Sequence, residues 1–192
     1  DHIESKTLAI DFKSGLWVCK NPDCGVSGKG PQQLEQKMYR QEHINDFEQQ
    51  LVHGKQMLEQ DEEVLQFLRQ ERGLSPETAL KHHLAVSTVS VKHRLTGVVS
   101  PKKYLLIPVF DQRGDLVAGR KYLLPAYRDE DDAKIKFAWP KSPITLYPMS
   151  SLKENKLVLT EGELDALVLL DRGIPAITTT GGSGAKFNEF TS

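Results

Sequence analysis

The stretch from Leu157 to Leu167 constrains the fold of this chain more than any other, because its pattern changes abruptly at a carboxylate. Residues 157–159 are consecutive aliphatic residues, which is typical of a short buried strand. Gly162 permits a tight turn that other residue types resist. Residues 163–170 then follow a helical pattern with their apolar side chains on one face. The sequence therefore predicts a strand, a turn and a helix, as in α/β folds.

The carboxylate of Glu161 falls at the C-terminal end of this predicted strand. That end of a strand is the edge of an α/β sheet where ligands usually bind. Asp165 follows on the first turn of the predicted helix, and two such acids suit a site for magnesium and phosphate. The alternative is structural, because an acid near a helix N-terminus is stabilised by the helix dipole. The local pattern leaves both interpretations open.

A second strand is predicted at residues 174–179, parallel to the first by the right-handed rule for β-α-β units. The glycine-rich residues 181–184 follow it and could bind phosphate through their N–H groups. They lack the Gly-Lys-Ser/Thr of a P-loop, and a flexible turn is the favoured interpretation. One β-α-β unit cannot cover both faces of a parallel sheet, so we expect the sequence to break off inside this domain.

Two cysteines, Cys19 and Cys24, lie at the end of a predicted hairpin that starts at Thr7. A structural zinc site needs four thiolate or imidazole ligands, and His2 could supply a third. The fourth ligand would then lie a few residues before Asp1. The alternative is two free thiols in a turn.

Residues from Gln32 to about Arg72 have a helical composition, and a break is expected near His53-Gly54. Gly73 is a plausible helix stop, and Ser75-Pro76 is a typical helix start. The two short helices at residues 61–83 could form a helix-turn-helix. A packed helical hairpin is the favoured interpretation, because the second helix is short and not markedly basic.

Residues 104–110 and 116–122 predict a β-hairpin with a glycine-containing turn. Basic residues surround it, and aromatic residues are interspersed. Such an arrangement can follow a phosphate backbone, with aromatic faces available for bases. Alternatively it is a solvated face balanced by the acids at 129–132. The basic residues are Lys102, Lys103, Arg120, Lys121, Lys134, Lys136 and Lys141.

The bulk composition excludes several classes of protein. With 192 residues, the chain can form one full domain and a smaller one. No apolar run approaches the ~20 residues that a membrane span needs, and no signal peptide is visible, so a cytoplasmic protein without a membrane partner is predicted. The net charge of −1 means that any surface for nucleic acid must be local.

Taken together, these pieces resemble a DnaG-type primase, and they occur in the order of that family over nearly the whole chain. The form Glu-Gly-Glu-x-Asp-Ala-Leu and the loop Thr-Thr-Gly-Gly-x-Gly look most like phage or plasmid primases or primase–helicases. The segments that carry the resemblance are residues 16–19 with Cys24-Gly25, residues 67–75, residues 107–111 with Gly114, Gly119-Arg120, Lys136-Phe137, residues 146–148, and residues 157–167 with Gly173-Ile174.

The resemblance implies an α+β chain with an α/β end. Its four parts would be a partial zinc ribbon (1–30), a helical linker (31–60), the N-terminal subdomain of the primase polymerase domain (61–150), which is mixed α/β, and the start of a TOPRIM fold with its parallel β-α-β unit (151–192).

The resemblance also implies roles for individual residues. Glu161 would be the catalytic glutamate and a ligand of Mg²⁺ or Mn²⁺, with Asp165 as a second candidate ligand. A structural Zn²⁺ would be bound by His2, Cys19 and Cys24. Template or triphosphate would be held by Arg120, Lys121, Lys136 and Lys141.

The implied activity is the synthesis of RNA primers on single-stranded DNA during replication, by two-metal nucleotidyl transfer from ribonucleoside triphosphates. The implied partner is a replicative helicase, fused or separate. The Asp-x-Asp pair of the family is absent after Glu161, so we expect no primer synthesis by the 192-residue chain alone. The alternatives are a non-catalytic, nucleic-acid-binding primase-like half of a helicase, or another TOPRIM enzyme such as a topoisomerase or nuclease.

Overall fold

The computed structural model describes residues 8–11, 16–19, 27–29, 31–92, 97–130, 132, 134–139 and 142–181, with side chains from residue 41 on. The chain has a mixed α/β fold and divides into two compact units, Asp1–His43 and Ile44–Ser192. Among the described residues, no helix is both long enough and apolar enough to span a lipid bilayer.

The first unit contains a small antiparallel sheet with the strand order β1-β2-β3. Leu8 pairs with Cys19 in the hairpin of the first two strands, which confirms the hairpin predicted before the cysteines. The strands are β1 (Leu8–Asp11), β2 (Leu16–Cys19) and β3 (Ser27–Lys29).

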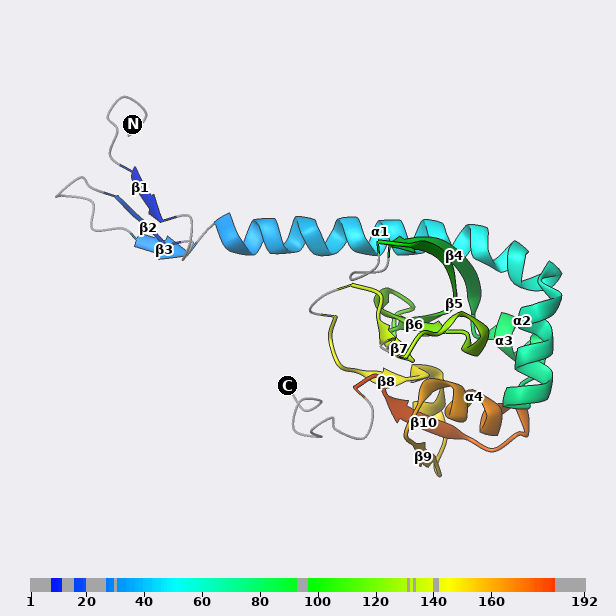
Figure 1. Cartoon of the computed structure of the whole chain (residues 1–192). Coiled ribbons are helices and arrows are strands. Elements are labelled where there is room, and N and C mark those ends of the chain that lie inside the picture. The colour runs from blue at the N-terminus through cyan, green and yellow to red at the C-terminus, as the bar shows by residue number, and fades with distance from the viewer. Residues whose placement is uncertain are drawn as a thin grey trace. The chain divides into compact units, whose positions relative to one another are not determined.

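The second unit is built on a four-stranded antiparallel sheet with the order β4-β5-β6-β7 (Figure 1). The β5–β6 hairpin is the one predicted from the alternating pattern and the glycine-containing turn, and a register shift at Val109/Phe110 interrupts its ladder. The strands are β4 (Ala85–Lys92), β5 (Val99–Phe110), β6 (Leu116–Leu123) and β7 (Ile135–Phe137).

Both faces of this sheet are covered. The second half of α1 (Pro31–Gln60) packs on one face, where Phe47 and Leu51 contact a buried cluster of the sheet (Figure 1). The other face packs on the short helices and on α4, through a larger core that includes Ile107 and Leu167. Alternate residues of β5 and β6 therefore face two different cores.

Helix α1 corrects two expectations about residues 31–60. It runs through Gly54 without the expected break. The residues from Ile44 onward belong to the second unit and bury Phe47, Leu51 and Leu58, so only the first part of this segment lies outside that unit. The glycine is required for space, since a Cβ at Gly54 would lie 2.3 Å from the carbonyl oxygen of Val86.

The predicted helical hairpin follows, in agreement with the favoured interpretation. Helix α2 (Glu62–Gln66) continues into a π-helical segment, η1 (Phe67–Arg72), which ends at Gly73 in the left-handed conformation (φ +65°). Ser75 then caps α3 (Pro76–Lys81) by accepting a hydrogen bond from the Thr78 N–H. Both the glycine stop and the serine start were predicted.

The C-terminal part forms a second sheet with the order β8-β10-β9, in which β9 and β10 are parallel and α4 connects them, as predicted. The sheet also takes in β8, which lies before the expected boundary at residue 151. Val158 and Leu159 of β9 are exposed, which corrects the expectation of a buried strand: β9 lies at the sheet edge. The elements are β8 (Leu146–Tyr147), β9 (Val158–Thr160), α4 (Glu163–Asp171) and β10 (Ala176–Thr179), with 3₁₀ turns η2 (Pro125–Tyr127) and η3 (Met149–Lys153).

Replacing Gly54 with alanine tests the contact between α1 and β4. Alanine normally favours a helix by about 1 kcal/mol over glycine. Here the added Cβ meets main-chain atoms of Val86, so we expect Gly54→Ala to lower the free energy of unfolding by about 2 kcal/mol, measured by urea denaturation. Val52→Ala, at an exposed site on the same helix, serves as control. A stabilised Gly54→Ala chain would contradict the packing described.

Candidate active-site cleft

Glu161 lies where the sequence predicted, directly after β9 and before α4. Its exposed side chain lines a cleft of about 220 Å³ together with Arg72, Arg120 and Lys134. The cleft therefore combines a carboxylate at a strand end with three cationic side chains from η1, β6 and the segment before β7.

Gly162 does not supply the unusual turn that was predicted. Its backbone is extended (φ −143°), a conformation that any residue adopts. A Cβ at this position would however lie 3.2 Å from Oδ2 of Asp165. The glycine thus leaves room for the carboxylate on the first turn of α4, rather than permitting an unusual turn.

Glu163 is the residue of this cleft that sequence reasoning missed. It is buried, and its Oε1 lies 2.9 Å from Nε of Arg120. Burial raises the pKa of Glu163, and the Arg120 guanidinium opposes that rise. Helical spacing could have revealed it, because Glu163 shares a face with Ala166 and Leu167, which are both buried. An acid on an apolar face requires a partner.

Arg120 is held from two sides. The pair with Glu163 satisfies its charge, and its guanidinium lies 4.1 Å from the centroid of the Phe137 ring. Phe137 is its cross-strand neighbour on β7. The predicted nucleotide-binding arginine is therefore a buried, fixed side chain in the wall of the cleft.

Asp165, the second candidate metal ligand, already has a partner. Its Oδ1 accepts a hydrogen bond from Arg72 at 2.7 Å, and its side chain remains 56% exposed. Within the part of the chain that the structure describes, no group of three or more His, Cys, Asp or Glu side chains is arranged to hold a metal ion.

The C-terminal end of α4 is fixed by another carboxylate. Asp171 accepts hydrogen bonds from the hydroxyls of Ser75 and Thr78, and from the N–H of Ser75 at 3.2 Å. These bonds lower the pKa of Asp171. Helix α4 is thus bound to the sheet at its start and to α3 at its end, which fixes the position of Glu161 one residue before the helix cap.

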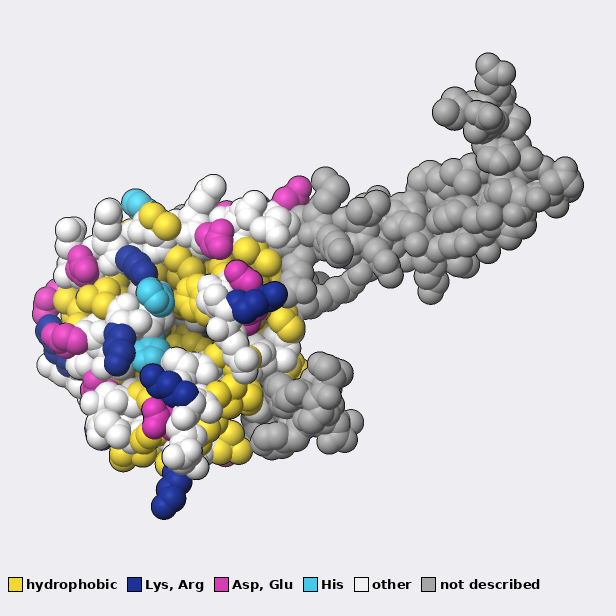
Figure 2. Space-filling view, turned by 180° about the vertical axis from the view of Figure 1, so that it is seen from behind, with side chains coloured by type: hydrophobic (Ala, Val, Ile, Leu, Met, Phe, Trp, Pro, Cys, Tyr) yellow, Lys and Arg dark blue, Asp and Glu magenta, His cyan; other side chains and the backbone are white. Residues whose placement is uncertain are grey.

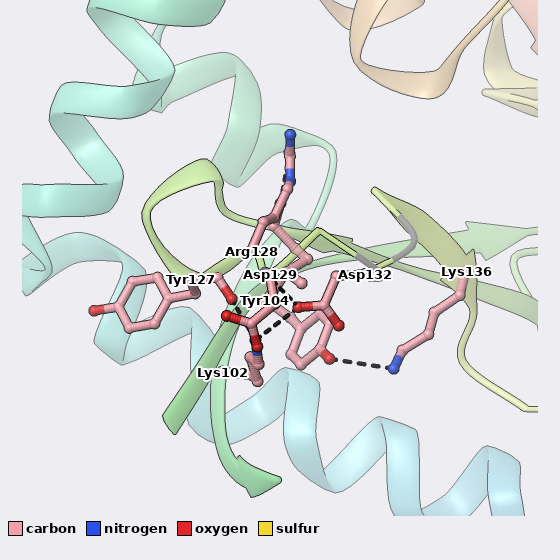
Figure 3. A network of polar contacts seen from close by, with 8 residues as sticks. Lys102, Tyr104, Tyr127, Arg128, Asp129, Asp132 and Lys136 are labelled. Carbon is pink, nitrogen blue, oxygen red and sulfur yellow. Dashed lines mark hydrogen bonds and ion pairs between the residues drawn. The ribbon is translucent and has the colours of Figure 1, made fainter. Parts of the chain in front are cut away.

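Of the other predicted nucleic-acid-binding residues, the two that the structure describes do not line this cleft. Lys121 and Lys136 are cross-strand neighbours on the opposite face of the sheet from Arg120. Lys121 donates to Gln50 of α1 at 3.3 Å, and Lys136 donates to the Tyr104 hydroxyl at 3.2 Å (Figure 3). Burial lowers the pKa of Lys121. Lys141 lies outside the described residues.

Lys102 and Lys103 are neutralised within the fold. Lys102 donates to Asp129 and Asp132 at 2.7 and 2.6 Å, as Figure 3 shows. Lys103 binds Asp61 and Glu63 in the same way, at 2.8 and 2.6 Å. Acids at 129 and 132 thus balance Lys102, as the alternative interpretation expected, but Lys102 is buried rather than solvated, and Lys103 is balanced by different acids.

The proposed zinc ligands are not tested by the geometry. His2 and Cys24 lie outside the described residues, and Cys19 is described only as the last residue of β2. A zinc site here stays a prediction from the sequence.

Among the comparisons with known proteins, only the comparison with solved structures gave matches, and these matches show the fold. No family model matches the chain, and no curated protein matches it. The primase of Aquifex aeolicus (zinc-binding and RNA polymerase domains) aligns with a TM-score of 0.56 and 15% identity, over 92% of this chain and 57% of that one.

Two further structures agree. A DnaG primase catalytic domain bound to single-stranded DNA has a TM-score of 0.53, 19% identity, and coverage of 78% of this chain and 58% of that one. The Escherichia coli primase catalytic core has a TM-score of 0.50 and 20% identity, covering 69% and 53%. The chain thus spans little more than half the length of these structures. The fold is that of a primase catalytic core, and specifically the DnaG type, as the resemblance implied.

The buried Arg120–Glu163 pair and the exposed Arg72–Asp165 pair differ in a measurable way. Glu163→Gln leaves a buried guanidinium without its counter-charge, so we expect a loss of about 3 kcal/mol in the free energy of unfolding. Asp165→Asn, half a turn further along α4, should cost less than about 1 kcal/mol because that pair is largely solvated.

A double variant shows whether the loss in the free energy of unfolding comes from an unpaired buried charge or from poorer packing. Replacing Arg120 with Met and Glu163 with Leu removes both charges, and should recover most of the lost stability. Urea denaturation of the four chains measures all three effects. Equal costs for Glu163→Gln and Asp165→Asn would contradict the assignment of a buried pair.

Proposed function

We propose that this chain forms part of a primase-type nucleotidyl-transfer centre that extends RNA on a single-stranded DNA template. The observation that carries the proposal is the cleft in which Glu161, at the end of a parallel strand, lies beside Arg72, Arg120 and Lys134. The likeness to primase catalytic cores, one of them bound to single-stranded DNA, supports it. The β9-α4-β10 unit would be the start of a TOPRIM fold.

Glu161 fits a role as one ligand of a catalytic Mg²⁺ or Mn²⁺. Its carboxylate is exposed in the cleft, and no ion pair engages it among the described residues. Magnesium sites commonly use one or two protein carboxylates together with substrate phosphates and water. When bound, the metal would neutralise charge on the reacting phosphates. Asp165 is less suited to this role, because Arg72 occupies one of its oxygens.

The cationic residues of the cleft have separate tasks in this proposal. Lys134 is exposed and can reach the phosphates of a ribonucleoside triphosphate. Arg120 supplies a fixed positive charge whose orientation Glu163 and Phe137 maintain. Lys121 and Lys136 would contact the template away from the cleft, since they face the other side of the sheet, and Lys141 stays a candidate template contact from the sequence. A replicative helicase remains the proposed protein partner.

Replacing Glu161 tests the proposed metal ligand. In the natural protein that carries this chain, we expect Glu161→Gln to reduce template-dependent primer synthesis by at least about 100-fold. The stability should not change, because the side chain is exposed. Mn²⁺ binding, followed by electron paramagnetic resonance, should weaken in parallel. Radiolabelled ribonucleotide incorporation measures the activity.

Glu154→Gln provides the control, because Glu154 is an exposed acid outside the cleft. It should leave both primer synthesis and Mn²⁺ affinity unchanged. Normal primer synthesis by Glu161→Gln would remove the catalytic proposal and favour a non-catalytic nucleic-acid-binding protein.

The zinc ribbon is tested by metal analysis. We expect about one Zn²⁺ per natural protein carrying this chain, and we expect Cys19→Ser or Cys24→Ser to abolish it, because each thiolate is one of four tetrahedral ligands. His53→Ala, at an exposed histidine of α1, should retain the metal. Full zinc content after Cys24→Ser, by inductively coupled plasma mass spectrometry, would refute the ligand set.

A further inference from the structure

A second, larger cleft lies between the end of α3, the turn after β5, and η3. Its volume is about 960 Å³, and no described residue lines both this cleft and the one at Glu161. Figure 2 shows a face of the second unit on which histidine and basic side chains surround a stretch of hydrophobic ones. We call this second cleft the histidine cleft, after His82 and His83 in its wall.

The charge of the histidine cleft is positive. Lys81 and Lys153 line it from α3 and η3, and both are exposed. Asp111 is the one carboxylate among the described lining residues, and its Oδ1 accepts hydrogen bonds from the main-chain N–H groups of Arg113 and Asp115 at 2.8 and 3.0 Å. Arg113 lies 3.4 Å from the other oxygen of Asp111, so these two charges offset each other. The two lysines provide the net charge.

The wall between these charges is aromatic. The ring of His83 stands edge-on to Phe110, with 5.4 Å between the centroids. Nζ of Lys55, which does not line the cleft, lies 2.7 Å from Nδ1 of His83 and so helps to fix the orientation of the ring. Burial, followed by the nearby charges, lowers the pKa of His82 to about 4, so its ring is neutral at physiological pH. Flat, uncharged ring faces beside cations suit a nucleobase next to phosphate.

We propose that the histidine cleft binds a segment of single-stranded nucleic acid, with phosphates at Lys81 and Lys153 and a base against Phe110 and His83. The inference rests on the proposed function in taking the template as the ligand. It adds a binding surface separate from the cleft at Glu161, formed by residues outside the basic set that surrounds the β5–β6 hairpin.

The chemistry of the cleft favours single-stranded nucleic acid over a nucleoside triphosphate or an acidic peptide as the ligand. The two lysines come from separate elements, Lys81 at the end of α3 and Lys153 in η3, which suits successive phosphates along a chain better than the adjoining phosphates of one triphosphate. An acidic peptide would complement the lysines but would make no use of the aromatic wall. A mixed stacking and electrostatic surface is typical of proteins that bind single strands.

Charge reversal at the two lysines tests the proposal. The affinity of the 192-residue chain for a fluorescein-labelled oligothymidylate is measured by anisotropy at several salt concentrations. Lys81→Glu and Lys153→Glu should each weaken binding on the order of five- to tenfold at ~0.1 M salt and reduce the salt slope by about one. Lys156→Glu makes the same charge change on an exposed lysine outside the cleft, and should have a smaller effect.

Histidine resonances provide a second measurement that does not depend on variants. The oligothymidylate should shift the ring signals of His82 and His83 in nuclear magnetic resonance spectra, whereas ATP or polyglutamate at equal charge should not. Equal shifts with ATP would identify a mononucleotide site, and equal shifts with polyglutamate would identify a site for acidic peptides. Either result overturns the proposal.

The outcomes also separate this inference from the proposed function. If the wild-type chain binds the oligothymidylate, but Lys81→Glu and Lys153→Glu weaken binding no more than Lys156→Glu does, the proposal for the histidine cleft is refuted and the proposed function is not. Failure of the wild-type chain to bind any single strand defeats the template proposal as well.

Discussion

The ion pair between Arg120 and Glu163 is the interaction on which the arrangement of the second unit depends. It joins β6 of the antiparallel sheet to the start of α4, and so to the parallel strands that α4 connects. Both side chains are buried, and a buried charge is stable only with its partner in place. Any shift of α4 along the sheet would leave two charges in a poorly solvated interior. The pair therefore fixes the position of α4 on the sheet as much as it contributes stability. Because Glu161 lies just before α4, its position is fixed as well.

Successive side chains of β6 point to opposite faces of the sheet, so its basic residues lie on different surfaces. Arg120 faces α4 and the cleft, whereas its neighbour Lys121 faces α1. In a sheet that is covered on both sides, adjacent cations cannot serve one ligand. The histidine cleft extends this division, because its cations come from other elements altogether. Among the described residues, the cations are therefore distributed over separate surfaces instead of one continuous basic groove.

Local signals in the sequence predicted the elements well and their long-range partners poorly. Gly73, Ser75 and the turn after Phe110 act on residues next to them in the sequence, so the sequence could place them. The sequence wrongly indicated a helix break at Gly54. The glycine is required because α1 packs closely against β4, which is distant in sequence. Glu163 of α4 was overlooked for the same kind of reason, because its partner Arg120 lies on β6, distant in sequence. For Lys102 and Lys103 of β5, the sequence indicated the acids at 129–132 as possible partners, but not Asp61 and Glu63 at the start of α2, which are distant in sequence.

The burial of Tyr147 extends these long-range contacts to β8. Tyr147 lines the histidine cleft, and Glu163 lines the cleft at Glu161. The pKa of Tyr147 is raised by its burial and further by the charge of Glu163. Tyr147 also belongs to the buried core that contains Leu164 and Leu167 of α4. Since packed, buried groups resist gradual deformation, this core holds β8 and α4 in a fixed arrangement.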